Sequence, residues 1–303
     1  MSVPVGTKQW LRAAGIRPRK AWGQNFLINA RVAERIVAAW PLDTGTAVLE
    51  IGAGAGALTL PLLARGVPVL AVERDPRLAT LLERRAAAEC PGAPLRVQVA
   101  DIRELAPGAE LAGGVAAGGE ISHWGLVGNL PYAVTTPIFE WVLKFRRHFA
   151  WAAFMVQREF AARLLAPVGS ADYGSLTLWV RFRYRVTKQL AVGQGNFWPI
   201  PKVDSIVVRL DPLTAPPVEV SNEARFERIV RAAFAHRRKV IAGSLAHSLR
   251  LPRATVDRAL EEAGIDSRKR AQECELDEFA ALSRVLEPLL AAAAPSRGLR
   301  NPH

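Results

Sequence analysis

Cysteine is almost absent from this sequence. Only Cys90 and Cys274 occur among 303 residues, far apart and outside any Cys-x-x-Cys or Cys/His grouping. A disulfide framework and a structural zinc site are therefore not indicated, so we expect no metal and a reducing, cytoplasmic environment. No stretch approaches the roughly 18 consecutive apolar residues of a membrane-spanning helix, and the N-terminal segment lacks the apolar core of a signal peptide. We therefore expect no association with a membrane.

Acidic residues are the minority among the charged ones. The sequence has 28 Asp and Glu against 40 Lys and Arg, a formal net charge of +12 at pH 7. A polyanionic partner such as a nucleic acid explains this excess, and so does a generally Arg-rich proteome. Half of the residues are hydrophobic, which is typical of a folded protein rather than a disordered one. Local patterns must separate the two explanations.

Short apolar segments alternate with helical patterns through the first two thirds of the chain. Helical spacing covers residues 31–40, 58–63 and 76–89, and residues 107–119 are expected to form a surface loop. Buried-strand patterns occupy residues 47–51, 67–72, 95–99, 124–127, 151–156 and 206–210. This alternation predicts an α/β fold with a doubly wound, Rossmann-like, mostly parallel sheet.

A proline-rich stretch at residues 211–217 marks the expected domain boundary. Only helical patterns follow it, over residues 226–249, 253–263 and 276–290. We therefore predict a cofactor-binding α/β domain of residues 1–211, a small all-helical domain of residues 212–294, and a disordered tail of residues 295–303.

A glycine-rich turn follows the first predicted strand. Gly52, Gly54 and Gly56 lie between this strand and a helical segment, where glycines let the backbone approach a ligand closely. The turn alone also fits a tight packing turn or a dinucleotide-dependent dehydrogenase. Glu73 and Asp101 then end the second and third strands, 21 and 49 positions after Gly52. Strand ends of a parallel sheet share one edge, so this ordered set predicts a nucleotide-like cofactor whose ribose hydroxyls bind Glu73.

The fourth strand ends in Asn129-Leu130-Pro131-Tyr132. This motif suits an enzyme that methylates an exocyclic adenine amine. Such an amine is a poor nucleophile because its lone pair is delocalised into the ring. Acceptors that hold its N–H groups therefore favour methyl transfer, and the side-chain oxygen of Asn129 and the carbonyl of Leu130, or of Pro131, are suitable. Pro131 stiffens this segment, and Tyr132 can stack on an extruded base. A simple strand-end turn is the alternative interpretation.

With these motifs in place, the sequence closely resembles the bacterial small-subunit (16S) ribosomal RNA adenine N6-dimethyltransferases. The resemblance extends over nearly the whole chain. It is carried by the glycine turn, by Glu73, Asp101 and the Asn129 motif, and by the segments Gly23-Gln24-Asn25-Phe26-Leu27, Phe197-Trp198-Pro199-Ile200-Pro201-Lys202-Val203-Asp204-Ser205 and His236-Arg237-Arg238-Lys239. The sequence departs from the family pattern at Ala133, Gly243 and Gln272, where a polar residue, Asn and Glu are usual.

The resemblance implies S-adenosylmethionine as cofactor and dimethylation of N6 on two adjacent adenosines near the 3′ end of small-subunit ribosomal RNA, within a pre-30S particle. It implies that Phe197 stacks the target adenine opposite Tyr132. It also implies that the cofactor site includes Asn25, Leu27, Gly52, Glu73, Asp101 and Asn129. Gly54 lies in the same glycine turn as Gly52, and we expect it to bind the cofactor as well. We expect a monomer. A large-subunit adenine methylase, a noncatalytic ribosome-assembly factor on the same fold and a nicotinamide dehydrogenase remain the alternatives.

Basic clusters supply the expected RNA contacts. Arg17, Arg19 and Lys20 precede the Gly23 motif, and Arg237, Arg238 and Lys239 are predicted to lie within the first helix of the second domain. Both clusters are expected to bind phosphates, with a merely solvated charged face as the alternative. A third set, Arg181, Arg183 and Arg185, alternates with aromatic residues and would share one face of a strand.

Overall fold

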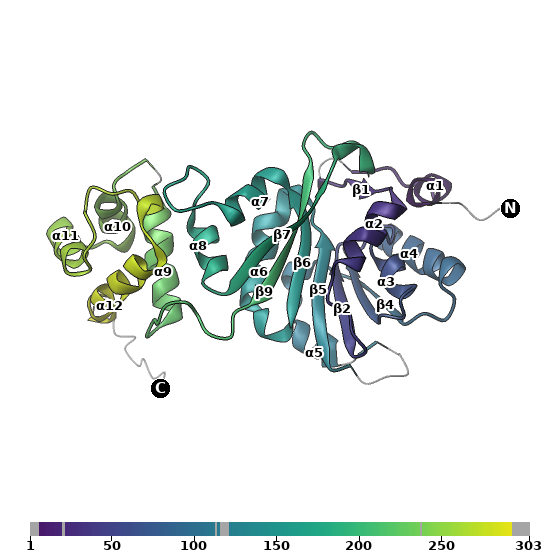
Figure 1. The fold of residues 1–303 in the computed structure, drawn as a ribbon, viewed down its shortest axis with the longest axis horizontal. Coiled ribbons are helices and arrows are strands. Elements are labelled where there is room, and N and C mark those ends of the chain that lie inside the picture. Colours follow the sequence, from purple (N-terminus) through teal and green to yellow (C-terminus); the bar gives the residue numbers. More distant parts are fainter. Residues whose placement is uncertain (1–5, 20–21, 113, 116–120, 237, 293–303) are drawn as a thin grey trace, which may run out of the picture. The chain divides into compact units, whose positions relative to one another are not determined.

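The computed structural model describes residues 6–19, 22–112, 114–115, 121–236 and 238–292. The chain forms two compact units (Figure 1). The first comprises Met1–Ala161 and Tyr184–Pro212, and the second comprises Ala162–Arg183 and Leu213–His303. The second unit therefore includes a segment that the sequence-based boundary assigned to the α/β domain. The proposed disordered tail lies outside the described residues.

A seven-stranded sheet forms the centre of the first unit, in the order β4-β3-β2-β5-β6-β9-β7. The first five strands of this order pair in parallel, each with its neighbour, whereas β9 runs antiparallel to both β6 and β7. The predicted mostly parallel, doubly wound α/β class is thus confirmed. The strands are β2 (Thr46–Ile51), β3 (Val69–Glu73), β4 (Leu95–Val99), β5 (His123–Asn129), β6 (Trp151–Gln157), β7 (Tyr184–Val192) and β9 (Ser205–Pro212).

Alternating side chains of the sheet pack against helices on its two faces. On β6, Ala153 and Met155 join the apolar core formed with α2 (Ala30–Ala38), α3 (Thr59–Leu63) and α4 (Pro76–Glu89). Phe154 points to the other face, because side chains alternate along a strand, and packs 5.4 Å, centroid to centroid, from Phe139 of α6 (Thr135–Lys144). Burial on both faces explains why these strands are continuous apolar runs in the sequence.

Local signals account for where the helices begin. Asp75 caps α4 by accepting a hydrogen bond from the backbone N–H of Arg77, and Pro76 fits the first helical position because no hydrogen bond is required of its nitrogen. Asn29 caps α2 in the same way. The remaining helices of this part of the chain are α1 (Thr7–Ala13), α5 (Pro107–Ala112) and α7 (Arg158–Leu165), the last of which leads into the second unit. Helix α5 lies within the segment expected to be a loop.

The second unit is helical, as its sequence predicts. Its core is lined by α8 (Ser175–Arg181), α9 (Glu223–Phe234), α10 (Ile241–Leu249), α11 (Arg253–Glu262) and α12 (Leu276–Ala292). The single helix expected over residues 226–249 is wrong, because a turn separates α9 from α10. Ser244 stabilises this turn: its hydroxyl donates to the carbonyl of Ala232 and accepts from the backbone N–H of His236.

The expected strand face of Arg181, Arg183 and Arg185 is also wrong. Arg181 ends α8, whereas β7 begins only at Tyr184. Arg183 is buried and pairs with Glu223 in the first turn of α9. The alternation of cations and aromatic residues therefore crosses a helix end, and only Arg185 of the three lies on the strand.

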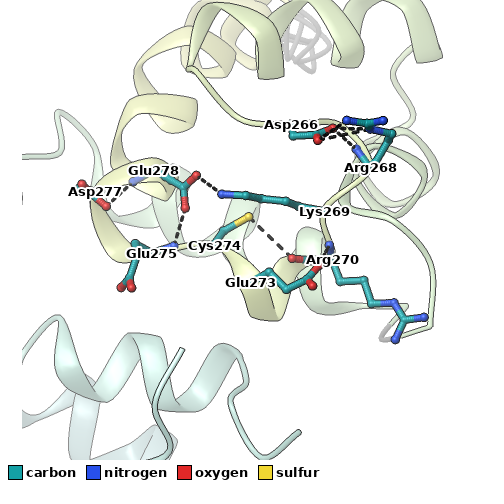
Figure 2. Close-up of polar contacts among 9 residues, drawn as sticks. All are labelled: Asp266, Arg268, Lys269, Arg270, Glu273, Cys274, Glu275, Asp277 and Glu278. Carbon is teal, nitrogen blue, oxygen red and sulfur yellow. Dashed lines mark hydrogen bonds and ion pairs between the residues drawn. The ribbon is translucent and has the colours of Figure 1, made fainter. Parts of the chain in front are cut away.

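Short-range polar pairs hold the connection between α11 and α12 (Figure 2). The ammonium of Lys269 donates to Glu278 at 2.7 Å, and the second carboxylate oxygen of Glu278 accepts from the backbone N–H of Glu275. The thiol of Cys274 contacts the carbonyl of Arg270 at 3.7 Å and is buried, which raises the pKa of this thiol to about 12. This cysteine is therefore a packing residue.

Within the described residues, the helices are all too short or too polar to cross a bilayer.

Candidate active site at the carboxyl ends of the parallel strands

One cavity of the first unit gathers almost all of the residues expected to act. It lies at the carboxyl ends of β2, β3 and β5, which end in the glycine turn, Glu73 and Asn129. Of the residues predicted for the cofactor and for catalysis, only Phe197 is missing from its lining. The lining positions are Asn25, Leu27, Gly52, Gly54, Glu73, Asp101, Asn129, Leu130, Pro131 and Tyr132.

The glycine turn is compact because its backbone requires glycine. Gly52, Gly54 and Gly56 have φ values of 68°, 59° and 83°, a region that residues with a Cβ rarely adopt. Space is also restricted at Gly56, where a Cβ would lie 2.6 Å from the Cδ1 of Leu82 on α4. Gly56 thus serves packing, whereas Gly52 and Gly54 line the cavity, where a ligand-binding role for them stays a prediction.

Glu73 joins the glycine turn to the start of α4. One carboxylate oxygen accepts from the backbone N–H of Gly54 and the other from that of Asp75, both at 2.8 Å. Burial raises the pKa of Glu73, while these two backbone hydrogen bonds act in the opposite direction. The backbone of Arg74 contributes a third hydrogen bond of this kind, and a carboxylate offers about four acceptor positions, so Glu73 retains acceptor capacity toward the cavity.

Glu50 is a second buried carboxyl group in the cavity lining, and sequence reasoning gave it no role of its own. It is 2% exposed, and the hydroxyl of Thr59 lies 2.6 Å from its Oε2. Desolvation raises its pKa to about 8, with a smaller contribution of the same sign from the charge of Glu73.

Asp101 is held by arginines at the rim of the cavity. The guanidinium of Arg103 contacts both carboxylate oxygens, at 2.9 and 2.6 Å, and lowers the pKa of Asp101. Arg74 lies 3.8 Å away. An ionised, fixed carboxylate at this position is a suitable acceptor for an amino group of a cofactor base.

Trp22 also lines the cavity and was missed by sequence reasoning. Arg19 and Arg74 lie over its ring, at 4.4 and 5.0 Å from the centroid, so that the indole contacts two guanidinium groups. Arg74 follows Glu73 directly, which places Trp22 beside the proposed ribose position. The contact with Arg74 joins residues from distant parts of the sequence, so no local pattern could have predicted it, whereas Arg19 is close to Trp22 in the chain.

Asn129 has its side-chain orientation set by a long-range hydrogen bond. Its Nδ2 donates to the backbone carbonyl of Asn25 at 3.0 Å. A carbonyl accepts only, so the group that faces it must be the NH₂ end of the amide. The Oδ1 of Asn129 is consequently left as an acceptor for a donor within the cavity.

The neighbouring carbonyl groups differ in availability. The carbonyl of Pro131 already accepts from the backbone N–H of Val134 and from the hydroxyl of Thr135, each at 3.1 Å. Two hydrogen bonds occupy both of its lone pairs, so Leu130 is the better second acceptor. The ring of Tyr132 lines the cavity, and its hydroxyl is anchored 3.0 Å from that of Ser205.

Phe197, which the family resemblance expects to stack on the target adenine, is buried in this structure. It is 1% exposed and belongs to the apolar core, on β8 (Phe197–Trp198), which pairs with β1 (Phe26–Leu27) so that Phe197 lies opposite Leu27. In this conformation Leu27 lines the cavity and Phe197 lies outside its lining. The buried position follows from the β1–β8 pairing, which sequence analysis did not predict.

The basic residues remain expected RNA contacts. Arg17 and Arg19 are exposed in the segment that follows α1, and Lys20 lies outside the described residues. Arg238 and Lys239 are exposed in the turn between α9 and α10, rather than within a helix, and Arg237 is again outside the described part.

Among the described residues, no group of acidic, His or Cys side chains is suited to bind a metal.

Comparisons with known proteins agree with one another. The family model described as ribosomal RNA adenine dimethylase matches residues 15–287. Ribosomal RNA small subunit methyltransferase A of Moorella thermoacetica is 38% identical over 288 residues, which cover 95% of this chain and 99% of that protein. The protein of the same name from Anaeromyxobacter dehalogenans (strain 2CP-C) is 40% identical over 274 residues, covering 89% and 94%.

Two solved structures are similar over most of the chain. A dimethyladenosine transferase from Plasmodium falciparum has a TM-score of 0.69 at 25% identity, covering 86% of this chain and 96% of that one. The 23S rRNA methyltransferase ErmE has a TM-score of 0.61 at 27% identity, covering 86% and 99%.

Proposed function

Because the chain belongs to the ribosomal RNA adenine dimethylase family, we propose that it dimethylates N6 of two adjacent adenosines near the 3′ end of small-subunit (16S) ribosomal RNA. The family resemblance seen in the sequence is thereby confirmed. The chain is a methyltransferase with a Rossmann-like class I fold, and its cofactor is S-adenosylmethionine. The proposal rests on one observation above all: Asn129, fixed by Asn25, leaves an amide oxygen in a cavity suited to this cofactor.

The residues of the cavity fit S-adenosylmethionine. Glu73 retains acceptor capacity for a ribose hydroxyl, and Gly52 and Gly54 of the glycine turn line the cavity. Asp101 is ionised and able to accept from the adenine amine, and Trp22 borders the same region. When bound, this cofactor supplies a methyl group on a positively charged sulfur that is already activated for transfer.

The protein residues then align the target amine. The Oδ1 of Asn129 and the carbonyl of Leu130 accept the two N–H groups and draw the nitrogen toward tetrahedral geometry, which localises its lone pair. Tyr132, anchored through Ser205, presents its ring to the extruded base. Most of the rate enhancement is expected from this alignment, since the reaction needs no strong general base.

The relatives favour the small subunit over the large one. The two small-subunit methyltransferases compared above are 38% and 40% identical to this chain over nearly its whole length. Among the solved structures, the dimethyladenosine transferase has a higher TM-score than the large-subunit enzyme ErmE, 0.69 against 0.61. We further propose that a monomer acts in the cytoplasm on a pre-30S particle, with Arg17, Arg19, Lys20 and the cluster Arg237, Arg238 and Lys239 as RNA contacts. A noncatalytic role is disfavoured by the complete set of acceptors around Asn129.

A methylation assay tests this function. Purified protein with labelled S-adenosylmethionine is incubated with unmethylated small-subunit particles and, separately, with large-subunit RNA, and the products are examined by mass spectrometry. We expect N6-dimethyladenosine at two adjacent positions near the 3′ end of the small-subunit RNA. Product in the large-subunit RNA alone would favour the large-subunit alternative, and no product in either would favour a noncatalytic assembly factor.

A further inference from the structure

A short proline-containing loop connects β8 to β9 and presents an apolar side chain to solvent. This loop, residues 199–204, is called the proline loop below. Ile200 is 68% exposed, the largest value among the large hydrophobic residues in the described part of the chain. A single exposed apolar residue is common on protein surfaces and means little by itself. Ile200 differs because the loop that carries it is attached at both ends to residues of the cavity.

Both ends of the proline loop are fastened to the cavity. At its start, Phe197 and Trp198 pair with Leu27 and Phe26, which are cavity-lining residues of β1. At its end, the hydroxyl of Ser205 lies 3.0 Å from that of Tyr132. The loop is thus bounded by the segment that contacts the cofactor and by the aromatic ring expected to receive the target base.

The loop is also stiff. Pro199 and Pro201 flank Ile200, and a proline limits both its own φ and the conformation of the residue before it. The side-chain carboxylate of Asp204 accepts a hydrogen bond from the backbone N–H of Gln194. The backbone carbonyl of Asp204 accepts another from the backbone N–H of Arg158. Holding Ile200 outward therefore costs little additional conformational entropy when a partner binds.

We propose that Ile200 is an apolar wedge that fills the place left in the RNA stack when the target adenosine enters the cavity, with Lys202 contacting an adjacent phosphate. This role rests on the proposed function. A target base cannot react while stacked, and unstacking it costs free energy, so a side chain that occupies the gap stabilises the extruded state. Lys202 is exposed on the same loop, which suits a polyanionic partner. Ile200 is a positioning residue in this account, since it touches neither the reacting nitrogen nor the cofactor.

The test compares Ile200→Ala and the conservative Ile200→Leu with the wild-type protein. The matched control is Val99→Ala, because Val99 is 55% exposed on the edge strand β4 and lies outside the cavity lining. Two substrates are used: folded small-subunit RNA, and a short unstructured RNA with the same target sequence. A 2-aminopurine at the target position reports base extrusion by fluorescence in the presence of S-adenosylhomocysteine.

We expect Ile200→Ala to lower kcat/KM on the folded RNA about tenfold and to reduce the fluorescence increase. The loss on the unstructured RNA should be smaller than about twofold, because little stacking has to be broken there. Ile200→Leu should restore most of the activity, while Val99→Ala should behave as wild type. Cofactor affinity should not change in any variant.

Two results would overturn the wedge. One is a normal rate and normal fluorescence for Ile200→Ala on folded RNA. The other is an equal loss on both RNAs, which would mean that Ile200 only supports the loop and Tyr132. Failure of the proposed function is distinguishable from both, because the wild-type protein itself would then leave small-subunit RNA unmethylated.

Discussion

Replacing Asn129 by alanine removes the acceptor that the structure orients into the cavity. We expect Asn129→Ala to slow methyl transfer about 100- to 1000-fold, the effect of losing one preorganised polar group worth roughly 3 to 4 kcal/mol in the transition state. The same change also removes the hydrogen bond from Nδ2 to the carbonyl of Asn25. Its loss is worth about 1 kcal/mol, so the dissociation constant of S-adenosylmethionine should rise only about fivefold.

Single-turnover methylation of small-subunit particles measures the chemical step, and calorimetry measures cofactor binding. Asn196→Ala is the matched control, because the Nδ2 of Asn196 also donates to a backbone carbonyl, that of Gly193 at 2.9 Å, but Asn196 lies outside the cavity lining. We expect that variant to transfer methyl groups at nearly the wild-type rate. A near-normal rate for Asn129→Ala, or equal losses in rate and in cofactor affinity, would refute the catalytic role of the amide oxygen.

Three further changes test other parts of the mechanism and the fold. Glu73→Ala should weaken S-adenosylmethionine binding by roughly 1 to 3 kcal/mol, the scale of a charge-assisted hydrogen bond to a ribose, and an unchanged dissociation constant in calorimetry would contradict the assignment. Neutralising Arg237, Arg238 and Lys239 together should lower the slope of log affinity against log salt for small-subunit particles by about 0.7 to 0.9 for each phosphate that is no longer bound, without changing cofactor affinity. An identical slope would mean a solvated surface. Because the pKa of Glu50 is raised from 4.5 to about 8, its folded form binds the proton more tightly, so its contribution to stability is complete below pH 4.5 and is lost as pH rises toward 8. Chemical denaturation of Glu50→Gln should show a flatter pH dependence in this window, and parallel curves would argue against the shift.

Local sequence patterns were sufficient for the frame of the α/β unit. Gly52 and Gly54 of the glycine turn, Glu73, Asp101 and Asn129 were all expected at or just after strand ends, and all of them line one cavity. The reason is geometric: apolar runs of strand length reveal buried parallel strands, and the carboxyl ends of such strands share one edge of the sheet. Helix α4 could be predicted to the residue, since its proline and its aspartate cap are local signals.

Tertiary structure alone decided how the side chains of the candidate site are oriented and buried. The amide of Asn129 is oriented by Asn25, 104 positions away, and Tyr132 is anchored by Ser205, 73 positions away. Phe197 is buried because β8 pairs with β1, and the turn between α9 and α10 depends on the hydroxyl of Ser244. Strand and helix signals arise from neighbours in the chain, whereas side-chain orientation and burial arise from contacts between distant segments, which no local pattern specifies.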